Sequence, residues 1–177
     1  MISTYRRAAV TDVDAVVELV ESAYRGESSR AGWTTEADLL HGQRTDPAAV
    51  EAAVSAADGP LLLLAQDSSG RVLGCCQLRA GADGVAQFGM FAVRPGVQGA
   101  GVGSALLAEA ERVAAAELGA HEVQMTVITQ RTELIAYYQR RGYSPTGQTR
   151  PFPYGDERFG LPQRPDLSFD VLAKLVR

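Results

Sequence analysis

RPGVQGAGVGSALLAEAERVAAAELG, residues 94–119, joins a glycine-rich turn directly to a helical pattern. The apolar positions recur at i, i+3 and i+4 spacing, which predicts a helix over 101–118 with one buried face: Leu106, Leu107, Ala110, Val113, Ala114 and Leu118. The first amides of a helix are unpaired and carry partial positive charge, and glycines before them let an anion approach closely. The stretch therefore predicts either an anion-binding loop or a plain glycine turn.

Two familiar phosphate-binding patterns do not fit this turn. The pattern G-x-x-x-x-G-K-[ST] needs a Gly-Lys pair, and the chain contains none. The pattern G-x-G-x-x-G/A fails because Gly99 and Gly101 are followed by Ser104 where glycine or alanine is required. Any anion site here must therefore belong to another class.

The composition fits one soluble domain over residues 1–177, of which 46% are hydrophobic and 21% charged. No run reaches the roughly 18 apolar residues of a membrane span. Residues 1–12 lack the apolar region of a signal peptide. We therefore expect a cytoplasmic protein without a membrane partner. The net charge of -4 gives no general attraction to nucleic acid, and the Arg, Ala and Gly bias is typical of bacterial genomes rich in G and C.

The two cysteines, Cys75 and Cys76, are neighbours in a predicted strand. Consecutive strand residues point to opposite faces, so these thiols are poorly placed to form a disulfide or to share a metal. No histidine lies near them in the sequence. We expect reduced thiols and no bound metal.

Hydrophobic periodicity and turn residues predict the element order βααβββαβαββ, a mixed sheet with helices on both faces. The first helix begins at Thr11 with Asp14 as its capping acid, and the second begins at Thr34 or Thr35. A further helical piece spans 46–57, and a Pro- and Gly-rich loop spans 149–166. The other expected elements are strands over 3–10, 60–67, 72–81, 84–93, 122–129, 144–148 and 167–175 and a helix over 132–141.

At the glycine turn the sequence resembles the GNAT N-acetyltransferase superfamily, whose acetyl-CoA loop reads Q/R-x-x-G-x-G/A. Residues 98–103, QGAGVG, have that spacing. Residues 90–95, MFAVRP, resemble the strand that pairs with the pantetheine arm, and residues 134–143, LIAYYQRRGY, resemble the later A-x-x-(F/Y)-Y-x-x-x-G-(F/Y) helix. The resemblance runs from Tyr5 to the last strand. It implies a GNAT-like α/β fold with a central, mixed, mostly antiparallel sheet and helices on both faces.

The resemblance also implies acetyl-CoA as the acetyl donor and assigns residues to its site. The implied donor-binding residues are Phe91, Ala92, Val93, Gln98, Gly99, Ala100, Gly101, Val102, Gly103, Ser104 and Arg131. Tyr138, four residues before Gly142, would protonate the departing CoA sulfur. The residues expected to contact the acceptor are Tyr24, Trp33, Phe152 and Tyr154. The alternative interpretation of each of these aromatic residues is that it packs in the core or under the late loop.

Two departures from the family pattern bear on the chemistry. Members often carry Asn seven residues before the tyrosine, where this chain has Arg131, which either reaches CoA or is a solvated first-turn residue. Many members supply a glutamate base from the strand over 84–93, but no Asp or Glu occurs between Asp83 and Glu109. The base must come from elsewhere or be water. The acids expected near the acceptor site, each with a surface charge as its alternative, are Glu27, Glu36, Asp156 and Glu157.

The sequence therefore predicts an acetyl-CoA-dependent N-acetyltransferase. Its acceptor would be the primary amine of a small molecule or amino-acid-like compound, attacking the thioester directly, and the loop over 149–166 would govern acceptor choice. The missing strand carboxylate keeps a second hypothesis open, a catalytically silent acyl-CoA-binding sensor. A monomer and a homodimer are both compatible with the sequence.

Overall fold

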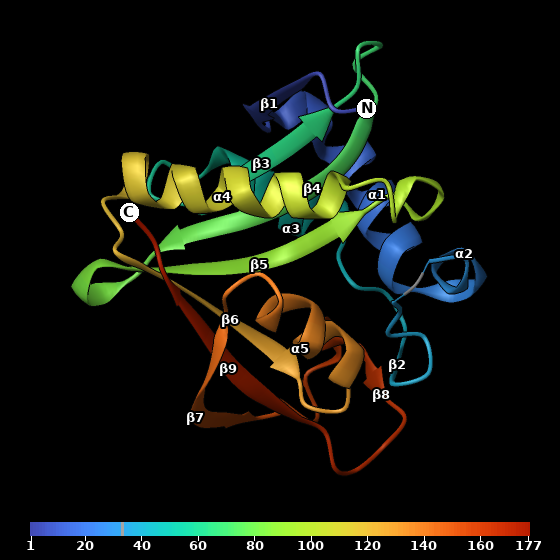
Figure 1. Cartoon of the computed structure of the whole chain (residues 1–177). Coiled ribbons are helices and arrows are strands. Elements are labelled where there is room, and N and C mark those ends of the chain that lie inside the picture. Colours follow the sequence, from blue (N-terminus) through green and yellow to red (C-terminus); the bar gives the residue numbers. More distant parts are fainter. Residues whose placement is uncertain (33) are drawn as a thin grey trace.

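A seven-stranded sheet forms the centre of the protein in a computed structural model that describes residues 1–32 and 34–177 (Figure 1). Every neighbouring pair of strands in it is antiparallel except β5 and β6, which run parallel. The strands, in spatial order, are β1 (Thr4–Arg7), β3 (Leu61–Gln66), β4 (Val72–Ala80), β5 (Val85–Val93), β6 (Glu122–Ile128), β9 (Ser168–Leu175) and β7 (Ser144–Pro151).

Helices cover both faces of the sheet. One face carries α4 (Val102–Leu118) and α5 (Thr132–Gln139), and the other carries α1 (Val13–Tyr24) and α3 (Pro47–Ser55) (Figure 1). No helix in the described ranges is both long and apolar enough to cross a bilayer. The smaller elements are α2 (Gly26–Arg30), the antiparallel pair β2 (Leu40–His41) and β8 (Leu161–Pro162), and the single turns η1 (Val10–Asp12), η2 (Ala82–Gly84), η3 (Pro95–Val97) and η4 (Glu157–Phe159). The predicted fold class, a mixed and mostly antiparallel sheet between two helical layers, is confirmed.

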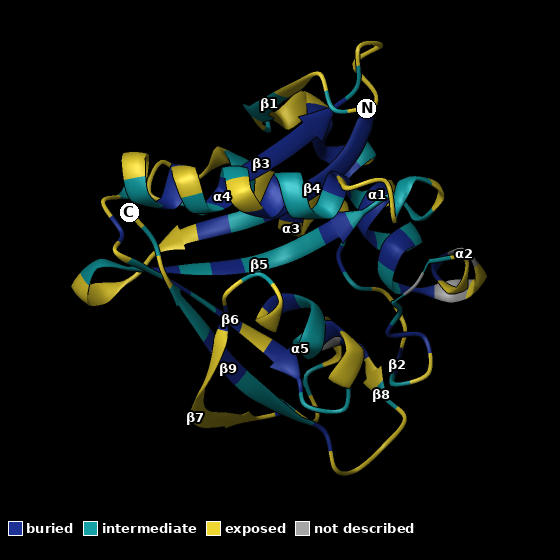
Figure 2. Ribbon diagram, in the orientation of Figure 1, coloured by how far each residue is buried: buried dark blue, intermediate teal, exposed yellow. Residues whose placement is uncertain are grey.

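The middle strands are buried on both faces because each face has its own helical cover (Figure 2). Cys75 packs among the residues of α1 and α3, whereas Cys76 packs among those of α4 and α5. The prediction that the two thiols point to opposite faces is therefore confirmed. Burial raises the pKa of Cys75 to about 12 and that of Cys76 well above its usual range, so both thiols stay protonated.

The start of the first helix differs from its prediction. Asp12, not Asp14, is the capping acid, because its Oδ2 accepts a hydrogen bond from the backbone N–H of Ala9 at 2.8 Å. Its two carboxylate oxygens also accept hydrogen bonds from the guanidinium of Arg6, both at 2.7 Å. The helix itself begins at Val13, after the single turn η1.

The prediction of a second helix starting at Thr34 or Thr35 is wrong. The extended backbone of Arg25 (φ -127°, ψ 154°) ends α1, and the chain turns at once into α2. The hydroxyl of Thr35 accepts a hydrogen bond from the N–H of Ala37, only two residues later, which closes a turn in place of a helix. The late loop is also shorter than predicted, because β7 continues to Pro151 and β8 forms inside the range 149–166.

The parallel contact between β5 and β6 is short. It joins residues 85–87 to residues 122–124 and then stops. A bulge follows in β5, where Met90 adopts a positive φ of 45° and the register against β4 shifts by one residue. Bulges bend a strand and increase its twist, so β5 and β6 diverge beyond this point (Figure 1). The divergence opens the sheet beside α5.

Candidate active site

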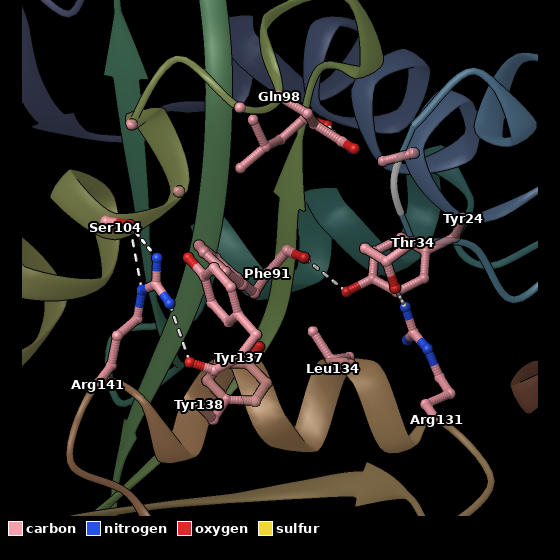
Figure 3. Close-up of a pocket in the computed structure, with 15 residues that line it drawn as sticks. Tyr24, Thr34, Phe91, Gln98, Ser104, Arg131, Leu134, Tyr137, Tyr138 and Arg141 are labelled. Atoms are coloured by element: carbon pink, nitrogen blue, oxygen red, sulfur yellow. Dashed lines mark hydrogen bonds between the residues drawn. The ribbon is translucent and has the colours of Figure 1, made fainter.

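Two cavities lie at the divergence of β5 and β6. The first, which we call the loop cavity, encloses about 190 Å³ between the start of α4, the end of β5 and helix α5 (Figure 3). The second, the sheet cavity, encloses about 170 Å³ between β5 and β6. Both are lined by Tyr24, Phe91, Arg131, Leu134 and Tyr138. The two cavities are therefore neighbours that share these residues in their walls.

The glycine turn presents free backbone amides to the loop cavity. Gly99 and Gly101 have positive φ values of 85° and 82°, and a Cβ added to either would meet nothing within 4 Å. The N–H groups of residues 101–104 form no hydrogen bond with another residue of the described ranges. These donors stand at the positive end of the macrodipole of α4. The turn thus has the form of an anion-binding loop, the first of its two sequence interpretations.

Arg141 adds a positive charge beside this turn. Its Nε donates to the hydroxyl oxygen of Ser104 at 3.1 Å and its Nη1 to the carbonyl of Tyr137 at 2.9 Å. The guanidinium carbon lies 3.4 Å from the centre of the Tyr137 ring, and no carboxylate of the described ranges pairs with Arg141. The sequence did not reveal this residue, because Arg140 and Arg141 are equivalent until the fold shows which one faces the turn.

Tyr138 lines both cavities. It is 4% exposed and packs within 6.3 Å of Phe91, measured between ring centres. Burial raises the pKa of Tyr138 well above its usual range. Its hydroxyl is therefore protonated, and available as a hydrogen-bond or proton donor, throughout the neutral pH range.

The end of β5 is held by side chains. The hydroxyl of Tyr24 donates to the carbonyl of Phe91 at 2.6 Å (Figure 3). Nε2 of Gln98 donates to the carbonyl of Val93 at 3.0 Å. A carbonyl oxygen has two lone pairs, so each group keeps one for a ligand. Burial raises the pKa of Tyr24 to about 12, which keeps its hydroxyl a donor. Three of the predicted donor-binding residues do not line the loop cavity with their side chains: Ala92, Ala100 and Val102.

A buried ion network closes the other end of the site. Glu36 Oε2 lies 2.7 Å from Nη1 of Arg25, and its Oε1 lies 2.8 Å from Nη1 of Arg131. Nη2 of Arg131 also donates to the hydroxyl of Thr34 at 2.7 Å (Figure 3). Burial by itself would raise the pKa of Glu36, but the charges of Arg131, Arg44 and Arg25 outweigh it and lower that pKa. Glu36 is therefore not a surface charge, and Arg131, 9% exposed, is not a solvated first-turn residue.

Only some of the residues predicted to contact the acceptor line the cavities. Tyr24 lines both cavities, and Trp33 lies outside the described residues. Phe152 and Tyr154 line neither cavity. Phe152 is buried and stacks on Phe169 at 5.7 Å between ring centres, and the hydroxyl of Tyr154 donates to the carbonyl of Arg164 at 2.9 Å. Both residues pack the late loop onto the body, which was their alternative interpretation. Three of the acids expected near the acceptor line neither cavity: Glu27, Asp156 and Glu157.

Comparison with known proteins places this site in context. The family model described as "Acetyltransferase (GNAT) family" matches residues 14–143. No curated protein sequence matches the chain significantly.

Solved structures share the whole fold at low sequence identity. A ribosomal-protein-alanine N-acetyltransferase from Brucella melitensis is 19% identical, with 98% of this chain and 100% of that chain covered and a TM-score of 0.71. The structure of yncA from Salmonella typhimurium with its cofactor acetyl-CoA is 19% identical, with 98% and 94% covered and a TM-score of 0.70. A chimera of the spermidine N-acetyltransferase SpeG from Vibrio cholerae and hSSAT is 13% identical, with 98% and 96% covered and a TM-score of 0.69.

The network around Glu36 leads to a prediction about stability. Glu36→Gln removes the only carboxylate that neutralises Arg25 and Arg131 among the described residues, so it should lower the free energy of unfolding by about 3 kcal/mol in urea titrations. Because the folded pKa of Glu36 is lowered, its contribution is present above the ordinary value of 4.5 and is lost as the pH falls through the folded pKa.

The difference in the free energy of unfolding between wild type and Glu36→Gln should therefore become smaller below about pH 4. Glu27→Gln is the matched control, since the Glu27 side chain is 93% exposed and should change stability by less than about 0.5 kcal/mol. Equal stabilities of Glu36→Gln and wild type at pH 7 would contradict the prediction.

Proposed function

This chain belongs to the GNAT acetyltransferase family, which uses acetyl-CoA, and we propose that it acetylates the primary amine of a small molecule. The observation that carries the proposal is that Tyr138 lines both cavities. A donor in the loop cavity and an acceptor in the sheet cavity would bring thioester and amine together beside that hydroxyl. Direct transfer between them would need no covalent enzyme intermediate.

The residues of the loop cavity fit acetyl-CoA. The free amides of residues 101–104 and the unpaired charge of Arg141 suit a pyrophosphate, because both offer donors and positive charge at one point. From there the cavity extends along Phe91 and Tyr137 to Tyr138, which suits a long, thin arm ending in a thioester. Bound acetyl-CoA would supply the activated acetyl group.

The transfer forms one bond and breaks one. The acceptor nitrogen bonds to the acetyl carbon while the carbon–sulfur bond breaks, the amine loses a proton and the sulfur gains one. Tyr138 is the proposed donor of the proton to sulfur, because it is protonated at neutral pH and borders both cavities. Glu36 is unsuited as the base, since its lowered pKa and two arginine partners make it a weak proton acceptor. We propose that the amine enters uncharged or loses its proton to water.

The function is tested by incubating the protein with acetyl-CoA and a panel of primary amines. Release of CoA thiol together with a mass gain of one acetyl group on an amine supports transfer. Tight binding of acetyl-CoA without turnover of any amine would favour the acyl-CoA sensor.

The donor seat can be tested at Gly103. A Cβ there would lie 3.0 Å from the Tyr137 hydroxyl and 3.5 Å from the Phe91 ring, so a larger side chain grows into the loop cavity. Gly103→Glu should weaken acetyl-CoA binding by about 100-fold or more in calorimetry, because a carboxylate would stand beside the phosphates. Gly96→Glu is the control: it adds the same charge to the same turn, where a Cβ meets nothing within 4 Å. Equal losses in both variants would contradict the assignment.

Tyr138→Phe tests the proton donor. It removes one hydroxyl and keeps the ring in the core, so kcat should fall by about 100-fold while acetyl-CoA affinity stays unchanged. Single-turnover rates are needed, since slow product release would hide part of the loss. Tyr143→Phe serves as the comparison, because Tyr143 packs on Tyr138 at 5.8 Å between ring centres but lines neither cavity. Full single-turnover activity in the Tyr138→Phe variant would reduce Tyr138 to a packing residue.

The dependence of the rate on pH should follow the acceptor and not the enzyme. Among the described residues that line the cavities there is no histidine or cysteine, the pKa of Glu36 is lowered, and those of Tyr24 and Tyr138 are raised. Between about pH 6 and 9, kcat/KM should therefore rise roughly tenfold per unit up to the pKa of the acceptor amine. Acceptors with different amine pKa values should shift the curve accordingly. A plateau common to all acceptors would indicate an enzymic base.

A further inference from the structure

The polar end of the sheet cavity holds more positive than negative charge. It is lined by Glu36, Arg44 and Arg131, and Arg25 stands behind Glu36. Both carboxylate oxygens of Glu36 are already engaged, one with Arg25 and one with Arg131. Three guanidinium groups thus face one carboxylate, and the buried Nε of Arg131 has no hydrogen-bond partner in the described part of the chain. This end of the cavity is suited to an anion.

Arg44 is the residue whose charge is least compensated. Its guanidinium carbon lies 5.2 Å from the centre of the Tyr24 ring, on which Arg131 also lies at 5.9 Å. Within the described ranges its side chain forms no hydrogen bond or ion pair. The nearby Glu21 does not neutralise it, because Oε1 of Glu21 accepts the backbone N–H groups of Arg44 and Thr45 at 2.6 and 2.8 Å. Glu21 therefore fixes the segment and leaves the guanidinium to the cavity.

The remaining wall of the sheet cavity is mainly apolar. Its apolar side chains include Phe88, Met90, Met125, Val127, Leu134 and Phe169. Apart from Glu36, no acid of the described ranges lines this cavity. A polyamine would bring further positive charge against the arginines, at short range and away from water, where repulsion is strong. A compound with an anionic group and an apolar body would match both parts of the wall.

We propose that the acceptor is an amino-acid-like compound whose carboxylate, or a related oxyanion, is bound by Arg44 and Arg131 while its apolar side chain contacts the sheet. The inference rests on the proposed function, since it names the acceptor class of the same reaction. Arg44 acts as a specificity-determining residue: it contacts the acceptor but takes no part in proton or acetyl transfer. The amine of such a compound lies only a few bonds from its oxyanion, so binding at the arginines holds it near Tyr24 and Tyr138.

The experiment compares acceptors that differ in one group. Leucine and phenylalanine are each assayed against the corresponding amide and the corresponding amine without the carboxylate, with spermidine as the polyamine. Rates are expressed per uncharged amine, because the amide has a lower amine pKa than the free amino acid. The amino acids should exceed their uncharged counterparts in kcat/KM by about tenfold or more. Amides, simple amines or spermidine that react as well as the amino acids would overturn the proposal.

Variants then assign the preference to Arg44. Arg44→Gln should raise KM for leucine by about tenfold or more and reduce the preference for leucine over leucinamide in kcat/KM, while the acetyl-CoA dissociation constant measured by calorimetry stays unchanged. Arg44→Lys keeps the charge and should recover part of the preference. Arg30→Gln is the matched control, because Arg30 lies outside both cavities and is half-exposed. Unaltered leucine kinetics in Arg44→Gln would overturn the proposal.

The two levels of hypothesis fail differently. If acetyl-CoA binds and amides or polyamines are acetylated without preference for an oxyanion, the proposed function stands and the acceptor class is wrong. If acetyl-CoA neither binds nor is consumed with any amine, the proposed function fails, and the acceptor class fails with it.

Discussion

The candidate site exists because the parallel pairing between β5 and β6 stops after a few residues. Three residue pairs join the strands, and the bulge at Met90 then turns β5 away. A sheet that closed here would satisfy its backbone groups strand to strand and leave no room for a ligand. The bulge requires Met90 to hold a positive φ, which is uncommon for a residue with a side chain. Strained backbone of this kind persists only where the surrounding structure fixes it.

A hydrogen bond from Tyr24 and the ion network beside it connect this part of β5 to the surrounding structure. Tyr24 of α1 donates its hydroxyl to the carbonyl of Phe91, directly after the bulge. The guanidinium groups of Arg44 and Arg131 both lie close to the ring of the same tyrosine, and Arg131 carries the connection on to Glu36 and Arg25. Residues from the N-terminal third of the chain are thereby joined to the start of α5 across the gap. Replacing a buried ion pair by apolar residues is often neutral for stability, so stability alone does not explain this network. We infer that its role is to place charged groups beside the cavities.

Some parts of the candidate site could be placed from local signals in the sequence. The glycine turn and α4 depend on spacing within a short segment, which is enough to express helix periodicity and free amides, and Tyr138 was singled out by the resemblance of its helix to the family motif. The opposite faces of Cys75 and Cys76 follow from the geometry of a single strand. These predictions needed no knowledge of which distant segments meet.

The other parts depend on contacts between distant segments. Glu36 and Arg131 are 95 positions apart, and nothing near either one in sequence indicates that the fold buries them together. Phe152 and Tyr154 were expected at the acceptor because their loop is rich in aromatic residues, yet they pack beneath it. The strands β2 and β8 have two residues each, which is too short for the alternation of apolar and polar residues that identifies a strand. Their pairing could therefore not be predicted from the sequence. Composition can identify such residues, but only the fold shows which way they face.

The charge of the site differs from the charge of the chain for a physical reason. A net charge of -4 describes the average over the whole surface, where salt screens interactions beyond about 8–10 Å. Inside the cavities the separations are shorter than that, so we expect the few charges that line the walls to have the largest effect on which ligand is bound. Arg141 at one end and Arg44 with Arg131 at the other make both ends cationic. An acidic protein can therefore present two cavities suited to anions; we propose that one binds the phosphates of the donor and the other the oxyanion of the acceptor, with Phe91 and Tyr138 lining both.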